Sequence, residues 1–395
     1  MKKKLIMTVV AAFGLGAAEA AGDVKLVSVG SHLPKLEELK ANIAKYEEQA
    51  PFDGVTFLIG GSSDVFNPEA YSDGQKREMN AAGEVYKSIP FKKWKYNFLS
   101  VLIDQHRPLW FDDDYWKNVT ENWTAAARLA KSCGMVGISL DPEGYGVYPV
   151  ESFWKATSCI EGKGNLLNGG GPQPPDPLHS EAQYVAEARK RGQQIGRAIF
   201  DAFPEMVLWS YYFWSFNGAD LMGAFCNGLL ETMPAKARLI DGDEWSGYCA
   251  QSPAAYERMK ARNETGCGML DEALKSKHMQ QGGFAPSFYM DAYAFPESND
   301  CLQPTIANVE DRVAFFAENL KAAISTTTGG HIWIYCEQLT WWPSEGGEVA
   351  DWESLLPGIR DVLFNTDRSN GAAAEINVTL PSPKVNLRLF KAMQR

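Results

Sequence analysis

The sequence predicts an α/β fold, a (β/α)8 TIM barrel. From Val24 onward, a short apolar segment with strand character alternates with a longer amphipathic segment. This alternation repeats eight times, which is the number that closes a parallel barrel. The main alternative is an open doubly wound sheet. Neither a Gly-x-Gly-x-x-Gly motif after the first apolar segment nor a phosphate loop is present, which removes the usual nucleotide-binding form of that alternative.

The N-terminus has the pattern of a secretory signal peptide. Lysines follow Met1, an apolar stretch extends from Leu5 to Ala18, and Ala18-Glu19-Ala20 has the small-x-small form of a cleavage site. We therefore predict a signal peptide at 1–20, a catalytic barrel at 21–370 and a secreted or periplasmic location in a bacterium.

The apolar segments are the predicted strands. They cover residues 24–30, 54–60, 97–104, 135–141, 206–213, 237–243, 287–293 and 331–337. Between them, apolar residues at helical spacing predict helices over 33–48, 116–132, 181–202, 254–262 and 309–326.

Three further segments do not fit the strand-helix repeat. Residues 162–177 are rich in Gly and Pro, so we expect a loop without strand or helix that acts as a lid over the fourth strand. Residues 64–75 form a polar excursion. Alternation over 375–389 predicts a small β-hairpin in a C-terminal extension, 371–395, that packs on the barrel.

Composition limits the partners. The net charge of -11 argues against nucleic acid and against an anionic membrane surface, because both attract a basic face. No segment after the signal peptide is long and apolar enough to span a bilayer, so no membrane association is expected after cleavage. The oligomeric state is not predicted.

Seven cysteines in an exported chain make disulfides possible. Cys133 and Cys336 lie beside or within apolar strands and are predicted to be buried thiols. The candidates for disulfides lie in loops, and their pairing is left open: Cys159, Cys226, Cys249, Cys267 and Cys301.

The end of the fourth predicted strand has two carboxylates on one side. Residues two apart on a strand point the same way, so Asp141 and Glu143 share a face. Pro142 has no N–H for a sheet, so the ladder is expected to stop there with Glu143 at the rim. Paired acids at the C-terminal rim of a barrel are typical of acid/base catalysis.

Acids and large aromatic residues dominate the other predicted strand ends. This combination suits sugar chemistry, because one carboxylic acid protonates the leaving oxygen, another carboxylate attacks or activates water, and aromatic rings hold sugar faces. The predicted catalytic residues are Glu143, Glu337 and Asp141, with Asp243 and Glu244 as competitors for the second carboxylate. The predicted substrate-binding residues are Asp104, His106, Trp110, Tyr145, Trp209, Tyr211, Asp243, Glu244, Trp245, Asp291, Tyr293 and Trp341.

With these residues, the chain resembles barrel glycoside hydrolases as a broad class. Many of them have their general acid, a glutamate, just after the fourth strand, where Glu143 stands. The resemblance implies that Glu337 is its partner. In the largest such clan the second glutamate follows the seventh strand, whereas Glu337 follows the eighth predicted strand.

The Asp141-x-Glu143 ending is also similar to the fourth strand of family 18 chitinases and related N-acetylglucosaminidases. That resemblance implies that Glu143 is the acid, that Asp141 steadies the substrate's N-acetyl group, and that this group is the nucleophile. Tyr293 and Trp333 fit the resemblance, whereas Ser139 stands where those enzymes have a further aspartate.

Two other functions compete with a glycosidase that acts on an oligosaccharide or polysaccharide. One is a secreted barrel that binds glycans without cleaving them. The other is a metal-dependent hydrolase, which needs several histidines at strand ends. Of the five histidines, His106 is well placed and His331 begins its strand, at the other end of the barrel. We therefore predict no catalytic metal and no cofactor, whereas a Ca2+ site with oxygen ligands in a loop is left open.

Overall fold

The computed structural model describes residues 23–30, 33–61, 63–103, 106–145, 147–149, 151–166, 171–172, 174–216, 218–296, 306, 308–341 and 350–369. The predicted signal peptide and the predicted C-terminal hairpin lie outside these residues, as does Asp104. Among the helices of the described ranges, none combines the length and the hydrophobicity that crossing a membrane requires.

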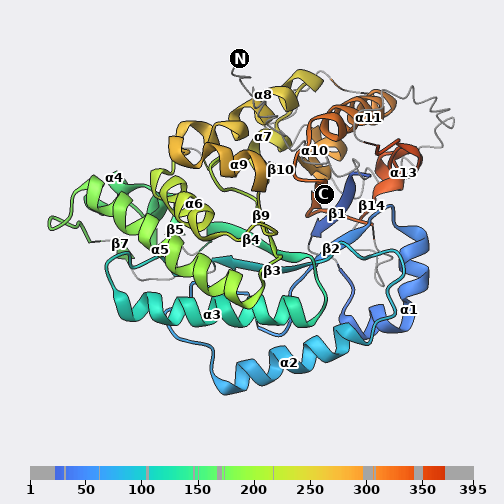
Figure 1. Cartoon of the computed structure of the whole chain (residues 1–395). Coiled ribbons are helices and arrows are strands. Elements are labelled where there is room, and N and C mark those ends of the chain that lie inside the picture. Colours follow the sequence, from blue (N-terminus) through green and yellow to red (C-terminus); the bar gives the residue numbers. More distant parts are fainter. Residues whose placement is uncertain are drawn as a thin grey trace, which may run out of the picture.

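A parallel sheet of nine strands forms the centre of the structure (Figure 1). Its strand order is β10-β9-β8-β4-β3-β2-β1-β12-β11. The α/β class and the parallel sheet are thus confirmed. The strands are β1 (Lys25–Gly30), β2 (Gly54–Phe57), β3 (Phe98–Ile103), β4 (Gly137–Gly144), β8 (Val207–Ser210), β9 (Arg238–Asp241), β10 (Gly282–Phe284), β11 (Ser287–Tyr289) and β12 (His331–Cys336).

The two outer strands of this sheet are neighbours in the chain. Only Ala285 and Pro286 separate β10 from β11. The Ala285 N–H donates to the carbonyl of Asp241, and the Trp333 N–H donates to the carbonyl of Pro286. The sheet therefore curls until its edges meet at this two-residue break. A closed (β/α)8 barrel stays a prediction.

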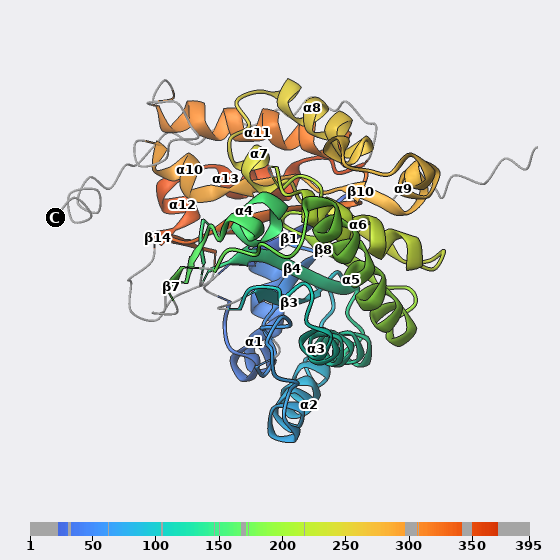
Figure 2. The ribbon, with the colours of Figure 1, turned by 90° about the vertical axis from the view of Figure 1, so that its left-hand side faces the viewer.

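Helices pack around the sheet. Figures 1 and 2 show α1, α2 and α3 on one side of it and α8 and α11 on the opposite side. The longer helices are α1 (Leu36–Gln49), α2 (Asp73–Lys87), α3 (Asp113–Ser132), α5 (Glu181–Ala202), α6 (Asp220–Thr232), α8 (Pro253–Glu264) and α11 (Val309–Thr326). The shorter ones are α4 (Ala156–Glu161), α7 (Glu244–Tyr248), α9 (Lys275–Gln281), α10 (Met290–Ala294), α12 (Trp352–Leu355) and α13 (Ile359–Asn365), with single turns at Ser152–Trp154, Gly266–Gly268 and Glu272–Leu274.

The structure corrects three expectations about these elements. The predicted strand 287–293 ends at Tyr289, because the chain turns into α10, and Asp291 and Tyr293 are therefore helical. The polar excursion contains the start of α2, whose first turn is fixed by a capping box between Ser72 and Gln75. The Gly- and Pro-rich loop takes part in a small antiparallel sheet of β5 (Val147–Tyr148), β6 (Asn165–Leu166) and β7 (Gly171–Pro172). A further pair joins β13 (Leu339–Thr340) to β14 (Ala350–Asp351).

The cysteines also differ in part from expectation. Cys133 and Cys336 are buried free thiols, as predicted. Cys249 takes part in a disulfide. The expectation of disulfides was wrong for Cys159, Cys226 and Cys267, which are thiols, and Cys159 and Cys226 lie on α4 and α6 rather than in loops.

Aromatic rings fill the interior at the N-terminal side of the sheet. Trp209 packs against His331, with ring centroids 5.0 Å apart, and against Phe98 at 5.3 Å. Trp333 packs on Trp209 at 5.5 Å, and all four side chains are fully buried. Burial lowers the pKa of His331 to about 3, so this histidine is neutral and part of the core.

Candidate active site

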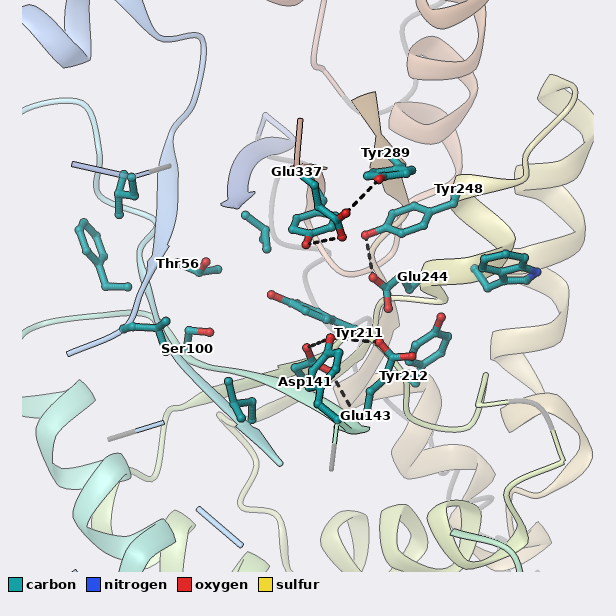
Figure 3. A pocket seen from close by; sticks show the side chains of 18 of the residues that line it. Thr56, Ser100, Asp141, Glu143, Tyr211, Tyr212, Glu244, Tyr248, Tyr289 and Glu337 are labelled. Atoms are coloured by element: carbon teal, nitrogen blue, oxygen red, sulfur yellow. Dashed lines mark hydrogen bonds between the residues drawn. The ribbon is translucent and has the colours of Figure 1, made fainter. Parts of the chain in front are cut away.

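A cavity of about 810 Å³ lies at the C-terminal ends of the strands (Figure 3). Four carboxylates from three different elements line it: Asp141, Glu143, Glu244 and Glu337. Six tyrosines share its lining: Tyr145, Tyr211, Tyr212, Tyr248, Tyr289 and Tyr335. Such a concentration of acids and hydroxyls in one concave space is the strongest candidate for a site of chemistry in the described part of the chain.

A break in strand pairing places the first two acids. Leu102 of β3 pairs with Asp141, but the next residue, Ile103, pairs with Gly144. The expected stop at Pro142 was therefore wrong, because β4 continues past it through this bulge. The bulge leaves Pro142 and Glu143 without partners on β3, and bulges of this kind re-aim side chains at the rims of sheets.

Tyr145 joins the two acids. Its hydroxyl lies 2.7 Å from Oδ2 of Asp141 and 3.3 Å from Oε2 of Glu143. The Glu143 N–H donates to Oδ1 of Asp141 at 3.1 Å. Both oxygens of Asp141 are thus hydrogen-bonded within the chain, and only 9% of this residue is exposed.

Burial changes the protonation of this pair. Removal from water raises the pKa of Asp141 to about 6, and hydrogen bonds from Tyr145 and from the Glu143 N–H limit the rise. Removal from water and the nearby Asp141 charge together raise the pKa of Glu143 to about 7. Both carboxyls are therefore protonated more readily than exposed acids are.

Glu244 supplies a third acid to the same space. It begins α7, directly after β9, and only 7% of it is exposed. The Tyr248 hydroxyl, one helical turn later, donates to Oε1 of Glu244 at 2.7 Å. Burial and the charges of Glu143 and Asp141 raise the pKa of Glu244 well above its usual range, which favours the neutral acid.

Glu337 follows β12 and is held by two tyrosines. The Tyr335 hydroxyl donates to Oε1 at 3.0 Å, and the Tyr289 hydroxyl donates to Oε2 at 3.4 Å. Asp291, buried on α10, accepts the backbone N–H groups of Glu337 and Gln338 at 2.9 and 2.8 Å. Asp291 therefore fixes the backbone from which Glu337 projects, and Figure 3 shows Glu337 beside Tyr289.

A flat aromatic surface lines the cavity below these acids. Tyr211 stacks on the buried Trp333, with ring centroids 4.7 Å apart and ring planes 14° apart. Tyr248 also packs against Trp333, at 5.8 Å. A rigid aromatic ring of this kind can support the apolar face of a ring-shaped ligand.

The cavity brings together seven of the residues that the sequence singled out. They are Asp141, Glu143, Tyr145, Tyr211, Glu244, Trp245 and Glu337. Asp243 is adjacent, in a second cavity, where it forms an ion pair with Arg262.

The other predicted residues that the structure describes do not line this cavity. His106 is paired with Asp64, with 2.7 Å between Nδ1 and Oδ2. Trp110 donates its indole N–H to the carbonyl of Phe153, and Trp341 donates to the carbonyl of Gln49, and both rings are buried. Trp209 is part of the interior, Asp291 acts on the backbone of Glu337, and Tyr293 is buried against Phe315 and Phe316.

Sequence reasoning did not select four of the lining tyrosines: Tyr212, Tyr248, Tyr289 and Tyr335. Spacing in the sequence could have identified two of them, Tyr335 and Tyr248. Tyr335 is two residues before Glu337 on a strand, and Tyr248 is four residues after Glu244 on a helix, so each shares a face with its acid. Tyr289 needs the sheet register, since it pairs with Tyr335 across β11 and β12.

Across the described ranges, no group of three or more His, Cys, Asp or Glu side chains has an arrangement that could hold a metal ion.

No protein-family model and no curated protein matches the sequence. Similar solved structures include a family 39 glycoside hydrolase from Bacteroides cellulosilyticus, with 8% identity and a TM-score of 0.46 over 86% of this chain; the chain spans 64% of that enzyme's length. A β-1,4-D-mannanase from Cryptopygus antarcticus has 10% identity and a TM-score of 0.42, with 90% of this chain and 95% of that one covered. Endonuclease IV from Thermus thermophilus has 11% identity and a TM-score of 0.35, with 87% and 100% covered. Similarities this distant do not bear on activity.

Proposed function

We propose that this protein is a secreted glycoside hydrolase that acts on an oligosaccharide or polysaccharide, with its site at the mouth of a closed barrel. The observation that carries the proposal is the pairing of Asp141 and Glu143 by Tyr145 inside a cavity that Glu337 also lines. Glycoside hydrolysis needs one carboxyl that holds a proton and one that does not, near the same bond.

Glu143 is the general acid. Its pKa of about 7 keeps a proton available at neutral pH, and its place at the rim of the cavity suits delivery of that proton to the glycosidic oxygen. The proton moves to the leaving oxygen as the bond to the anomeric carbon breaks. The Glu143 carboxylate that remains then lies beside the hydroxyl of Tyr145.

Glu337 is the second carboxylate. Both of its oxygens accept tyrosine hydroxyls, and its backbone is fixed by Asp291, so the group is oriented as an acceptor toward the cavity. Asp141 is less suited to attack the substrate, because it is buried, whereas Glu337 is exposed. Its charge instead raises the pKa of Glu143.

Mutagenesis on a panel of chromogenic aryl glycosides tests this function. We expect Glu143→Gln to lower kcat/KM by about 10² to 10⁴-fold and to leave ligand binding intact. Glu205→Gln is the matched control, because Glu205 is exposed and precedes β8 at the opposite end of the sheet. A wild-type protein that binds glycans and hydrolyses none of them would establish the non-catalytic glycan-binding alternative.

A second comparison decides which group completes the reaction. If Glu337 does, Glu337→Gln reduces activity about as strongly as Glu143→Gln does, and Asp141→Asn reduces it less. If the substrate's N-acetyl group is the nucleophile, only 2-acetamido glycosides are hydrolysed and Asp141→Asn is the more damaging change.

A further inference from the structure

A second cavity, of about 680 Å³, adjoins the first. Glu143, Tyr212 and Trp245 line both, so the boundary between the cavities contains the proposed general acid. Trp245 is 61% exposed at this boundary, which leaves much of its indole ring open to a ligand. Deeper in the second cavity, Tyr212 stacks on Phe216 with ring centroids 4.7 Å apart.

Two residues with strained backbone conformations lie next to Arg262 in the second cavity. Among the described residues, only Asp243 and Cys267 have a positive φ without being glycine, at 41° and 50°. Both line the second cavity, and Arg262 lies against both of them. The buried Asp241 accepts the Asp243 N–H at 3.1 Å, which helps to hold the strained turn. Residues held in such conformations concentrate at ligand sites.

Two of the three acids that line this cavity, Asp243 and Glu151, are each paired with a basic side chain, and Arg262 is the only basic residue among the described lining residues. Arg262 Nη2 lies 3.3 Å from Asp243 Oδ2, and Lys155 Nζ lies 3.2 Å from Glu151 Oε1. Each pair offers hydrogen-bond donors and acceptors side by side without a net charge. Such a wall suits the hydroxyls of a neutral sugar, whereas a carboxylate or sulfate would meet the acids Glu143, Glu151 and Asp243 and no unpaired cation among the described lining residues.

We infer that the second cavity binds the leaving-group sugar of a neutral oligosaccharide, with Arg262 and Asp243 as hydrogen-bonding partners of its hydroxyls and Trp245 as a stacking surface. This inference rests on the proposed function, because it uses the position of the general acid. A glycosidic oxygen that receives a proton from Glu143 joins two sugars, and one cavity lies on each side of Glu143. The first cavity then holds the sugar whose anomeric carbon reacts.

Two substrates with the same reacting sugar distinguish the contribution of the second cavity to kcat/KM from that of the first. A glycosyl fluoride has a single atom as its leaving group and does not reach the second cavity, whereas an oligosaccharide does. The measured quantity is the ratio of kcat/KM for the oligosaccharide to kcat/KM for the fluoride. We expect Arg262→Gln to lower this ratio by about 10-fold, the effect of losing one or two good hydrogen bonds.

A second variant tests the space in the cavity rather than the charge of Arg262, whose Nη1 also donates to the Ser246 hydroxyl at 3.4 Å. Ser246 lines only the second cavity, so Ser246→Trp fills that space and should lower the ratio at least as much. Arg128→Gln, at an exposed arginine on α3, is the matched control and should leave the ratio as in the wild type. Wild-type kcat/KM should also be at least about 10-fold higher for a neutral leaving-group sugar than for its uronic acid counterpart.

The outcomes separate the two proposals. If the wild type hydrolyses the fluoride and the oligosaccharide but neither variant changes the ratio, the second cavity is not the leaving-group site and the glycosidase proposal stands. If wild-type kcat/KM is the same for neutral and for acidic leaving-group sugars, only the assignment of the second cavity to neutral sugars is wrong. If the wild type hydrolyses neither these substrates nor any aryl glycoside, the glycosidase proposal fails and this inference falls with it.

Discussion

The Tyr145 hydroxyl donates a hydrogen bond of 2.7 Å to Oδ2 of Asp141, and the hydroxyl oxygen of Tyr145 also lies 3.3 Å from Oε2 of Glu143. One phenol thus stabilises the charged forms of two neighbouring acids, and it lowers the pKa of each relative to burial alone. This contact links the structure of the site to its expected dependence on pH.

Removal of this hydroxyl should shift the pH profile. In Tyr145→Phe the pKa of Glu143 rises further, so the basic limb of kcat/KM against pH moves to higher pH, and kcat at pH 6 falls by about 10-fold because the acid is less well positioned. Tyr184→Phe is the control, since it deletes another tyrosine–aspartate bond of 2.7 Å, to Asp176, outside the cavity. An unchanged basic limb in Tyr145→Phe would contradict the assignment.

The wild-type profile itself tests Glu143. The general acid must be protonated, so kcat/KM should fall as pH rises through about 7. A 2,4-dinitrophenyl glycoside needs no proton at its leaving group, so for this substrate Glu143→Gln should retain activity with no basic limb in this range. A basic limb that persists in Glu143→Gln with this substrate would show that a group other than Glu143 titrates in this range.

Stability should depend on pH through the same residue. The pKa of Glu143 in the folded protein lies above its ordinary value of 4.5, so the folded state holds a proton that the unfolded state releases. The stability from this proton is fully present below pH 4.5 and is lost as pH rises through 7. At pH 8, Glu143→Gln should therefore be more stable than the wild type by about 1 to 3 kcal/mol, with no such advantage at pH 4. Urea unfolding of both proteins at the two pH values measures the difference, with Glu205→Gln expected to follow the wild type.

Asp291 should affect activity through the position of Glu337. Asp291→Ala removes the acceptor of two backbone N–H groups, so we expect a loss of about 1 to 3 kcal/mol in unfolding free energy and a fall in kcat of at least about 10-fold. Asp291→Asn keeps one acceptor oxygen and should recover most of the stability and part of kcat. Equal kcat values for the wild type and Asp291→Ala would show that this anchor does not orient Glu337.

The sequence was sufficient to predict the repeating elements and the acids at strand ends. Helices α5 and α11 have the predicted bounds, because their apolar spacing is long and regular. Glu143 and Glu337 line one cavity because the ends of parallel strands meet at one edge of a sheet.

Other features depend on contacts that one sequence does not contain. Trp110 and Trp341 follow strand ends as the lining residues do, but helices and loops close over their rings, and local sequence gives no sign of this. The bulge that extends β4 past Pro142 depends on the register with β3. The separate strands β10 and β11, with Ala285 and Pro286 between them, depend on pairing with β9 and β12 respectively.

The packed rings of Trp209, Trp333, Phe98 and His331 close the interior at the N-terminal side of the sheet. These side chains are fully buried and pack against one another, so no channel continues through this part of the described interior. A ligand of the first cavity therefore enters and leaves on the side of the strands' C-terminal ends. For the proposed glycosidase, incoming substrate and outgoing product then share one route, and the free reducing sugar should act as a competitive inhibitor that slows turnover as it accumulates.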